Sequence, residues 1–191
     1  MRGPWDDDDV PNDGTRIDLG CLRIPNMQHL ELHVDVDEST GRGVGLSLVL
    51  PMSIAAIQVF ARAKDEEMWP TVQEGIKQGL AIQDVESTIV WTHFGLELRS
   101  TMPTVDTHGK ARVQPVRFIG VDGPRWFLRV VVSGAAAHEE DSMREMDELL
   151  KDIVVVRGNS PMPNGERLEI ALPSDPHVVA DDAPHTFHIE L

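Results

Sequence analysis

The sequence predicts an α+β fold, a sandwich in which a largely antiparallel β-sheet of about six to eight strands carries two main helices. The first reason is the order of elements, because most strand-like segments follow one another with no helix between them. The second is that two segments, 65–80 and 138–151, have the apolar spacing of amphipathic helices. The third is size, since 191 residues with 41% hydrophobic side chains suit one domain with one core.

Composition divides the chain into three parts. Residues 1–16 hold a run of four aspartates, and we expect an acidic flexible segment in which Trp5 docks on the domain. Residues 17–173 carry the apolar patterns and are expected to form the single α+β domain. Residues 174–191 are polar, and we expect a flexible tail.

The first part of the domain has the pattern of an antiparallel meander. A short strand is expected at 17–24, and residues 30–36 alternate apolar and polar side chains as a half-buried strand does. Strands at 44–50 and 54–62 follow, separated by a break at Pro51. Although the stretch across this break carries no charge, its alternation predicts two strands and no membrane helix.

The first helix is predicted at 65–80, where three acidic residues supply a favourable start. Pro70 must lie in the first turn, because further along it would clash with the preceding turn. Gly75 and Gly79 weaken the helix but should let it lie close on the sheet. The apolar stripe of this helix consists of Trp69, Val72, Ile76 and Leu80.

The second part of the domain again begins with strands. In order we expect strands at 87–94 and 95–102, a polar loop at 103–110, a hairpin at 113–133, a helix at 138–151 with its acids outside, a buried strand at 153–156, and an edge strand at 168–172.

The hairpin within Gln114–Gly134 is the segment around which we expect the sheet to be built. Two β-rich runs flank a Val-Asp-Gly-Pro turn sequence. A three-residue loop over Asp122–Pro124 would leave one face of the hairpin wholly apolar. A two-residue Asp-Gly turn would mix the faces, so we favour the longer loop.

The favoured loop fixes which residues face each other across the hairpin. It places Trp126 opposite Gly120 on the core side and Arg117 opposite Arg129 on the other side. The shorter turn would instead pair Arg117 with Leu128.

Arg117, Arg125, Arg129 and Asp122 are therefore the candidate interaction residues. Two guanidinium groups side by side repel one another unless an anion lies between them, so Arg117 and Arg129 could bind a small anion or a partner's carboxylate. The alternative, which we favour, is internal neutralisation by one of the 32 acidic residues, such as Asp122 or the N-terminal aspartates.

Charge and cysteine content exclude several classes of function. The formal net charge of −15 argues against binding nucleic acid or an anionic membrane surface. Cys21 is the one cysteine, so no disulfide forms within the chain, and we expect it buried and unreactive. Together with the absence of an apolar leader, this predicts a cytoplasmic protein.

No motif for a catalytic centre or a cofactor is found. The chain lacks a phosphate-binding loop, a dinucleotide fingerprint and a nucleophile elbow. The eight histidines do not cluster at metal-ligand spacing, so we expect no metal and no cofactor.

Four segments resemble one known family. Gly3–Asp6, Arg16–Gly20, Gln114–Arg129 and Ile153–Gly158 are similar to the distinctive segments of an actinobacterial domain-of-unknown-function family, DUF3710. The resemblance implies an actinobacterial, cytoplasmic protein and transfers no catalytic residues. The element order also resembles the PsbP-like sandwich, which is used mainly for binding partners.

We therefore expect a non-enzymatic interaction module that binds an acidic protein partner or a second copy of itself. One alternative is a module that holds a small apolar or anionic metabolite between helix and sheet. The other is a hydrolase or transferase, which would require a pocket joining His93 or His138 to a carboxylate with a shifted pKa.

Overall fold

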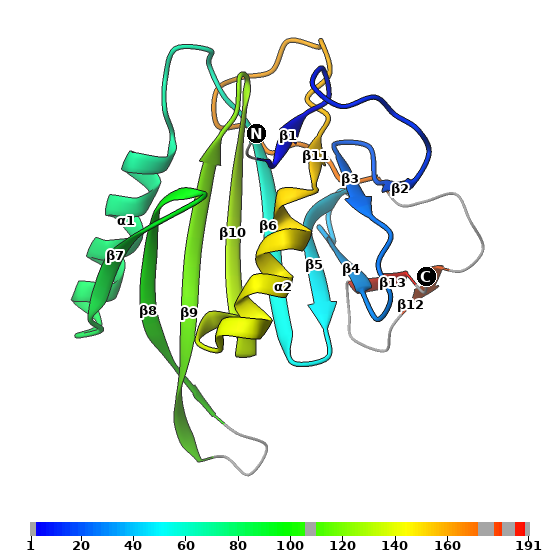
Figure 1. The fold of residues 1–191 in the computed structure, drawn as a ribbon. Coiled ribbons are helices and arrows are strands. Elements are labelled where there is room, and N and C mark those ends of the chain that lie inside the picture. The colour runs from blue at the N-terminus through cyan, green and yellow to red at the C-terminus, as the bar shows by residue number, and fades with distance from the viewer. Residues whose placement is uncertain (1–2, 106–109, 172–177, 181–185, 190–191) are drawn as a thin grey trace.

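The computed structural model describes residues 3–105, 110–171, 178–180 and 186–189. The described part of the chain forms two β-sheets and two α-helices, which confirms the α+β prediction (Figure 1). One sheet is larger than predicted, with nine strands, and the other has four.

The nine-stranded sheet is antiparallel throughout. Its order is β12-β13-β4-β5-β6-β10-β9-β8-β7. The strands are β4 (Glu31–Val36), β5 (Gly43–Leu50), β6 (Ser53–Ala61), β7 (Ser87–Thr92), β8 (Gly95–Val105), β9 (Ala111–Asp122), β10 (Trp126–Gly134), β12 (Val178–Ala180) and β13 (Thr186–Ile189).

The four-stranded sheet joins the two ends of the domain. Its order is β1 (Trp5–Asp6), β11 (Val154–Val155), β3 (Leu22–Pro25) and β2 (Arg16–Asp18). β1 runs parallel to β11, and the Trp5 N–H donates to the Ile153 carbonyl at 2.9 Å. The acidic opening of the chain therefore contributes a strand, and Trp5 docks on the domain as expected.

Some of the remaining predicted segments differ in detail. Of the predicted tail 174–191, residues 178–180 and 186–189 are the strands β12 and β13, which extend the large sheet beyond β4, and the rest lies outside the described residues. The predicted polar loop 103–110 starts as strand, because β8 continues to Val105. The predicted edge strand at 168–172 is reduced to isolated bridges from Ile170.

The first helix, α1 (Trp69–Ile82), begins later than predicted and without the acidic residues 65–67. Pro70 lies in its first turn as predicted. The carboxylate of Asp122 fixes the start by accepting the backbone N–H groups of Met68 at 2.9 Å and Trp69 at 3.0 Å. Gly75 and Gly79 face open space, so they do not bring the helix close to the sheet.

The second helix, α2 (Glu140–Lys151), follows a 3-10 turn at Ala135–Ala137. Its apolar residues Met146, Leu149 and Leu150 are buried as predicted, but the acid Asp147 is buried with them. The main core lies between α2, the four-stranded sheet and one face of the large sheet. Figure 1 shows α2 lying across the middle of the large sheet and α1 beside β7 and β8.

The predicted hairpin loop is wrong. The chain reverses over Pro124 and Arg125, and the Gly123 N–H donates to the Trp126 carbonyl at 2.9 Å. Proline suits the first central position of such a turn. Asp122 stays in β9 because it caps α1. Position 123 requires glycine, because a Cβ atom there would lie 2.0 Å from the nearest ring atom of Trp126.

The new turn shifts the register by an odd number of residues, so every side chain of one strand changes face relative to the other strand. Arg117 lies opposite Val132, and Arg129 lies opposite Gly120. The two arginines therefore point to opposite faces of the sheet, and the predicted Arg117–Arg129 pair does not exist. Trp126 is buried as expected, at 1% exposure, but Gly120 lies under the ring of Trp69 instead.

Candidate interaction site

Arg117 is fully buried in an ion cluster on the α2 side of the sheet. Its guanidinium forms a two-pronged contact with Glu97, at 2.8 Å to Oε1 and 2.9 Å to Oε2. It also donates to the Ala136 carbonyl at 3.1 Å and forms an ion pair with Asp147, whose Oδ1 lies 2.9 Å away. Arg99 adds a second cation 2.6 Å from Glu97.

The cluster neutralises Arg117 from within the protein. Burial by itself would lower the pKa of Arg117, but the hydrogen bonds and charges of Glu97 and Asp147 outweigh it and raise that pKa. Internal neutralisation was the favoured interpretation, but its partners are Glu97 and Asp147 and not Asp122 or the aspartate run. Arg117 is therefore a structural residue that no outside anion can reach.

His93 lies at the rim of this cluster, with Nε2 3.8 Å from Asp147 Oδ2. Burial lowers the pKa of His93 and raises the pKa of Asp147, and each shift is partly opposed by the charge of the neighbouring group. Within the described residues, no group hydrogen-bonds to His93 Nε2. His138 is half-exposed and lies 3.6 Å from the exposed Glu139.

Two other predicted site residues also serve the fold. Asp122 caps α1 and lies 3.8 Å from Arg62, which donates to the Gly123 carbonyl. Arg125 donates to the Gly158 carbonyl at 2.7 Å and to Asn159 Oδ1 at 3.2 Å. It therefore holds the hairpin turn against the loop after β11.

Arg129 faces outward on the other side of the sheet and, unlike Arg125, has a second cation as its neighbour. Its guanidinium carbon lies 5.7 Å from the centre of the Phe60 ring, and it donates to the side-chain oxygen of Gln58. A second guanidinium, that of Arg167, lies at the same distance of 5.7 Å from the same ring. Phe60 thus carries two cations, an arrangement that we call the Phe60 clamp.

Neither cation of the Phe60 clamp forms an ion pair with a carboxylate in the described part of the chain. The pKa of Arg129 is lowered, first by burial and then by the positive charge of Arg167. Cation–π contacts with Phe60 compensate only part of this cost. In a chain of net charge −15, two neighbouring cations without an acid are an unusual local excess of positive charge.

The Phe60 clamp lies at one end of a sheet surface that we call the open face. α1 covers this side of the sheet over Gly120 of β9 and over Phe127 at the start of β10. The rest of β10 and the neighbouring strands β6 and β5 carry exposed or half-exposed side chains on this side. Cross-strand pairs place the half-exposed or exposed residues of the open face side by side; these are Val49, Ile54, Ala56, Gln58 and Val131.

Arg167 was missed by the sequence analysis for a physical reason. It lies in the loop after β11 and reaches Phe60 through an isolated bridge between the two residues. No periodic pattern marks such a loop residue. The pairing depends on the Leu168 N–H, which donates to the Val59 carbonyl at 2.9 Å and so draws the loop along β6.

The remaining expectations concern metals, membranes and the cysteine. Within the described residues no group of three or more metal-ligating side chains is placed to hold an ion, and no described helix could cross a membrane. The uncharged segment expected to form two strands is β5 and β6. Cys21 is buried as predicted, and burial raises the pKa of its thiol to about 12.

Comparison with known proteins gives one match. The model of the family described as "Protein of unknown function (DUF3710)" matches residues 3–178, so the chain belongs to this family. No curated protein and no solved structure matches the chain. The resemblance in the four sequence segments is thereby confirmed, while the PsbP-like likeness stays a prediction.

Proposed function

We propose that this member of the DUF3710 family is a non-enzymatic protein-interaction module, located in the cytoplasm, whose open face binds an acidic polypeptide segment through the Phe60 clamp. The observation that carries the proposal is the pair Arg129 and Arg167, held 5.7 Å from one aromatic ring with no carboxylate paired to either. A partner that supplies carboxylates would relieve the repulsion between the two guanidinium groups.

The surroundings favour a polypeptide over an isolated small anion. Ile54 is 44% exposed on the open face, and Val49 and Ala56 lie beside it. A segment with carboxylates followed by an apolar side chain would contact both the clamp and this apolar area. Arginine is favoured at such interfaces because its planar group binds carboxylates by two hydrogen bonds while packing on aromatic rings.

The proposal is tested with peptides of defined sequence. Peptides selected from a random displayed library on the whole protein should be enriched in Asp and Glu. Their affinity should fall by about tenfold or more in the double variant Arg129→Gln, Arg167→Gln, because charge-assisted hydrogen bonds are lost. It should also weaken with added salt.

Arg144→Gln supplies the matched control. Arg144 is an exposed arginine on α2, on the other side of the sheet, paired with Glu140 and Asp141. Its removal should leave peptide affinity unchanged. If the library yields no acidic peptide, or if the selected peptides bind the clamp variant as well as the control, the proposed function is wrong.

A further inference from the structure

The strand β7 is an unprotected edge of the large sheet. It is the last strand in the sheet order and pairs with β8 on one side, with no second strand beside it among the described residues. Soluble proteins usually protect such an edge with a charge, a proline or a bulge. The sequence Ser-Thr-Ile-Val-Trp-Thr of β7 contains neither charge nor proline, and its pairing with β8 is regular.

The side chains of this edge expose a large apolar patch. Trp91 is 71% exposed, Ile89 is 49% exposed, and Leu96, opposite Trp91 on β8, is 45% exposed. The three lie on the α1 face of the sheet, because Ile89 pairs with Leu98 and Leu98 pairs with Phe118. Phe118 shares its face with Gly120, which lies under the ring of Trp69 of α1. Contiguous exposed apolar side chains of this kind mark interaction surfaces.

The backbone of β7 is also poised to accept a strand. Two residues separate Thr92 from Gly95, the first pair of the hairpin. Such flanking pairs exchange hydrogen bonds, and the pattern alternates along an antiparallel ladder. The N–H and C=O groups of Thr92 and Val90 therefore point to β8, and those of Ile89 and Trp91 point away from it.

The neutral charge and the symmetry of β7 favour a second copy of the chain as the occupant of this edge. Two copies of a chain with net charge −15 repel one another over most of their surface. β7 is neutral from Ser87 to Thr92, so two copies can meet there without opposing like charges. The strand is also self-complementary, because an antiparallel pair centred on Val90 would set Ile89 of each copy opposite Trp91 of the other.

We propose that two copies of this chain associate through β7, paired antiparallel about a two-fold axis at Val90, so that the two large sheets become continuous. The association uses residues remote from the Phe60 clamp and stands independently of the proposed function. Each copy contributes an aromatic side chain and a β-branched side chain to two identical cross-strand contacts. Both apolar residues lose part of their exposure in the dimer.

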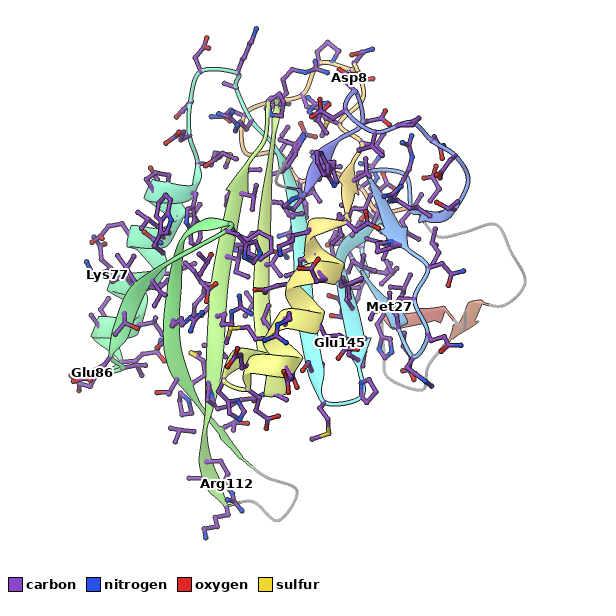
Figure 2. The ribbon with its side chains drawn as sticks, in the orientation of Figure 1. Asp8, Met27, Lys77, Glu86, Arg112 and Glu145 are labelled. Atoms are coloured by element: carbon purple, nitrogen blue, oxygen red, sulfur yellow. The ribbon has the colours of Figure 1, made fainter. Side chains whose placement is uncertain are left out.

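Hollows border β7 on both faces of the sheet. A hollow of about 500 Å³ lined by residues including Lys77, Ala81 and Glu86 lies on the α1 side. Another of about 300 Å³, lined by residues including Thr88 and Arg99, lies on the opposite side. Figure 2 shows Lys77 and Glu86 at the outer edge of the molecule.

Sedimentation velocity over a range of protein concentrations tests the association. The whole chain should sediment as a dimer, and Trp91→Lys should convert it to a monomer by placing a charge on the edge. Val113→Lys is the matched control, because Val113 is an apolar residue of β9 that is 70% exposed. A chain that stays monomeric at every concentration, or a dimer that Trp91→Lys leaves intact, overturns the proposal.

A cysteine at position 90 tests the register. Val90 would face itself in a non-hydrogen-bonded pair, where the Cα atoms lie about 4.5 Å apart and a disulfide can form. Val90→Cys should give an oxidised covalent dimer, whereas Thr88→Cys, whose partner would be Thr92, should not. The buried Cys21 cannot substitute for either. A dimer in which Val90→Cys fails to crosslink overturns the proposed pairing.

Salt separates this proposal from the proposed function. Added salt should strengthen the dimer, because it screens the repulsion between two acidic copies, whereas it should weaken acidic peptides at the Phe60 clamp. If the dimer does not strengthen with salt, the proposed function still stands, and if peptide binding does not weaken with salt, the proposed dimer still stands.

Discussion

Arg117 and Arg129 lie on the two strands of one hairpin, yet they occupy opposite electrostatic environments. Arg117 is fully buried and is held by Glu97 and Asp147. Arg129 is half-buried, has another cation as its neighbour and has no acid paired to it among the described residues. The first can be removed only at the expense of the fold, whereas the second adds little to the fold. This difference indicates which of two similar residues is available to a partner.

The largest effect should come from breaking the Arg117 cluster. Arg117→Met leaves Glu97 buried with Arg99 as its remaining cation, and unfolding free energy should fall by about 3–5 kcal/mol, as when one member of a buried ion pair is lost. Urea unfolding followed by circular dichroism measures it. Adding Glu97→Leu should restore part of the stability. A loss below about 1 kcal/mol in the single variant would contradict the structural role.

A smaller effect is expected at Asp122, which the sequence grouped with the arginines. Asp122→Ala removes the cap of α1 and should cost about 1 kcal/mol, with faster hydrogen exchange in the first turn of the helix. Asp122→Asn keeps one side-chain oxygen and should cost less. Equal stability of Asp122→Ala and the parent chain would show that α1 does not depend on this cap.

The comparison also shows what the sequence could and could not predict. Local patterns were sufficient for the strands β4, β5 and β6 and for the stripe of α2, because alternation and helical spacing are read within one element. The hairpin register was not predictable in this way. It depends on Asp122 bonding to α1 and on Gly123 lying under Trp126, contacts that reach outside the hairpin or into its turn.

The same limit applies to the candidate site. The sequence singled out Arg129 but assigned it the wrong neighbour, since a register error of odd length transfers Arg117 to the other face. Its actual neighbour, Arg167, is brought there by a loop that follows β6 through backbone hydrogen bonds. Asp147 was expected outside on α2, because helical spacing does not reveal that a buried cation faces it.

The rim of the Arg117 cluster should give a weaker, pH-dependent effect. The pKa of His93 is lowered in the folded protein from its usual 6.5, so below that pH the unfolded chain binds the proton more readily and stability falls. Asp147 acts in the opposite direction, because its raised pKa lets the folded state take up a proton first, in more acidic solution nearer its usual 3.8. Lys151, Arg117 and Glu148 also face His93.

The measurement is unfolding free energy between about pH 7.5 and 5.5 in the parent chain and in His93→Gln. The parent should lose more stability on acidification than the variant, and the other histidines cancel in the difference. Parallel curves for the two proteins would show that His93 titrates equally in the folded and unfolded states.

The smallest effect on stability should come from the Phe60 clamp, which makes it the direct counterpart of the Arg117 variant. The double variant Arg129→Gln, Arg167→Gln removes a repulsion and leaves no buried acid unpaired. Unfolding free energy should therefore change by no more than about 0.5 kcal/mol, and the expected direction is a rise. Urea unfolding beside Arg117→Met measures both under one condition. A loss above about 1 kcal/mol would mean that the clamp holds Phe60 and the loop after β11 in place. If the double variant is about as stable as the parent chain but no longer binds peptide, then Arg117 maintains the fold and Arg129 is free to contact a partner.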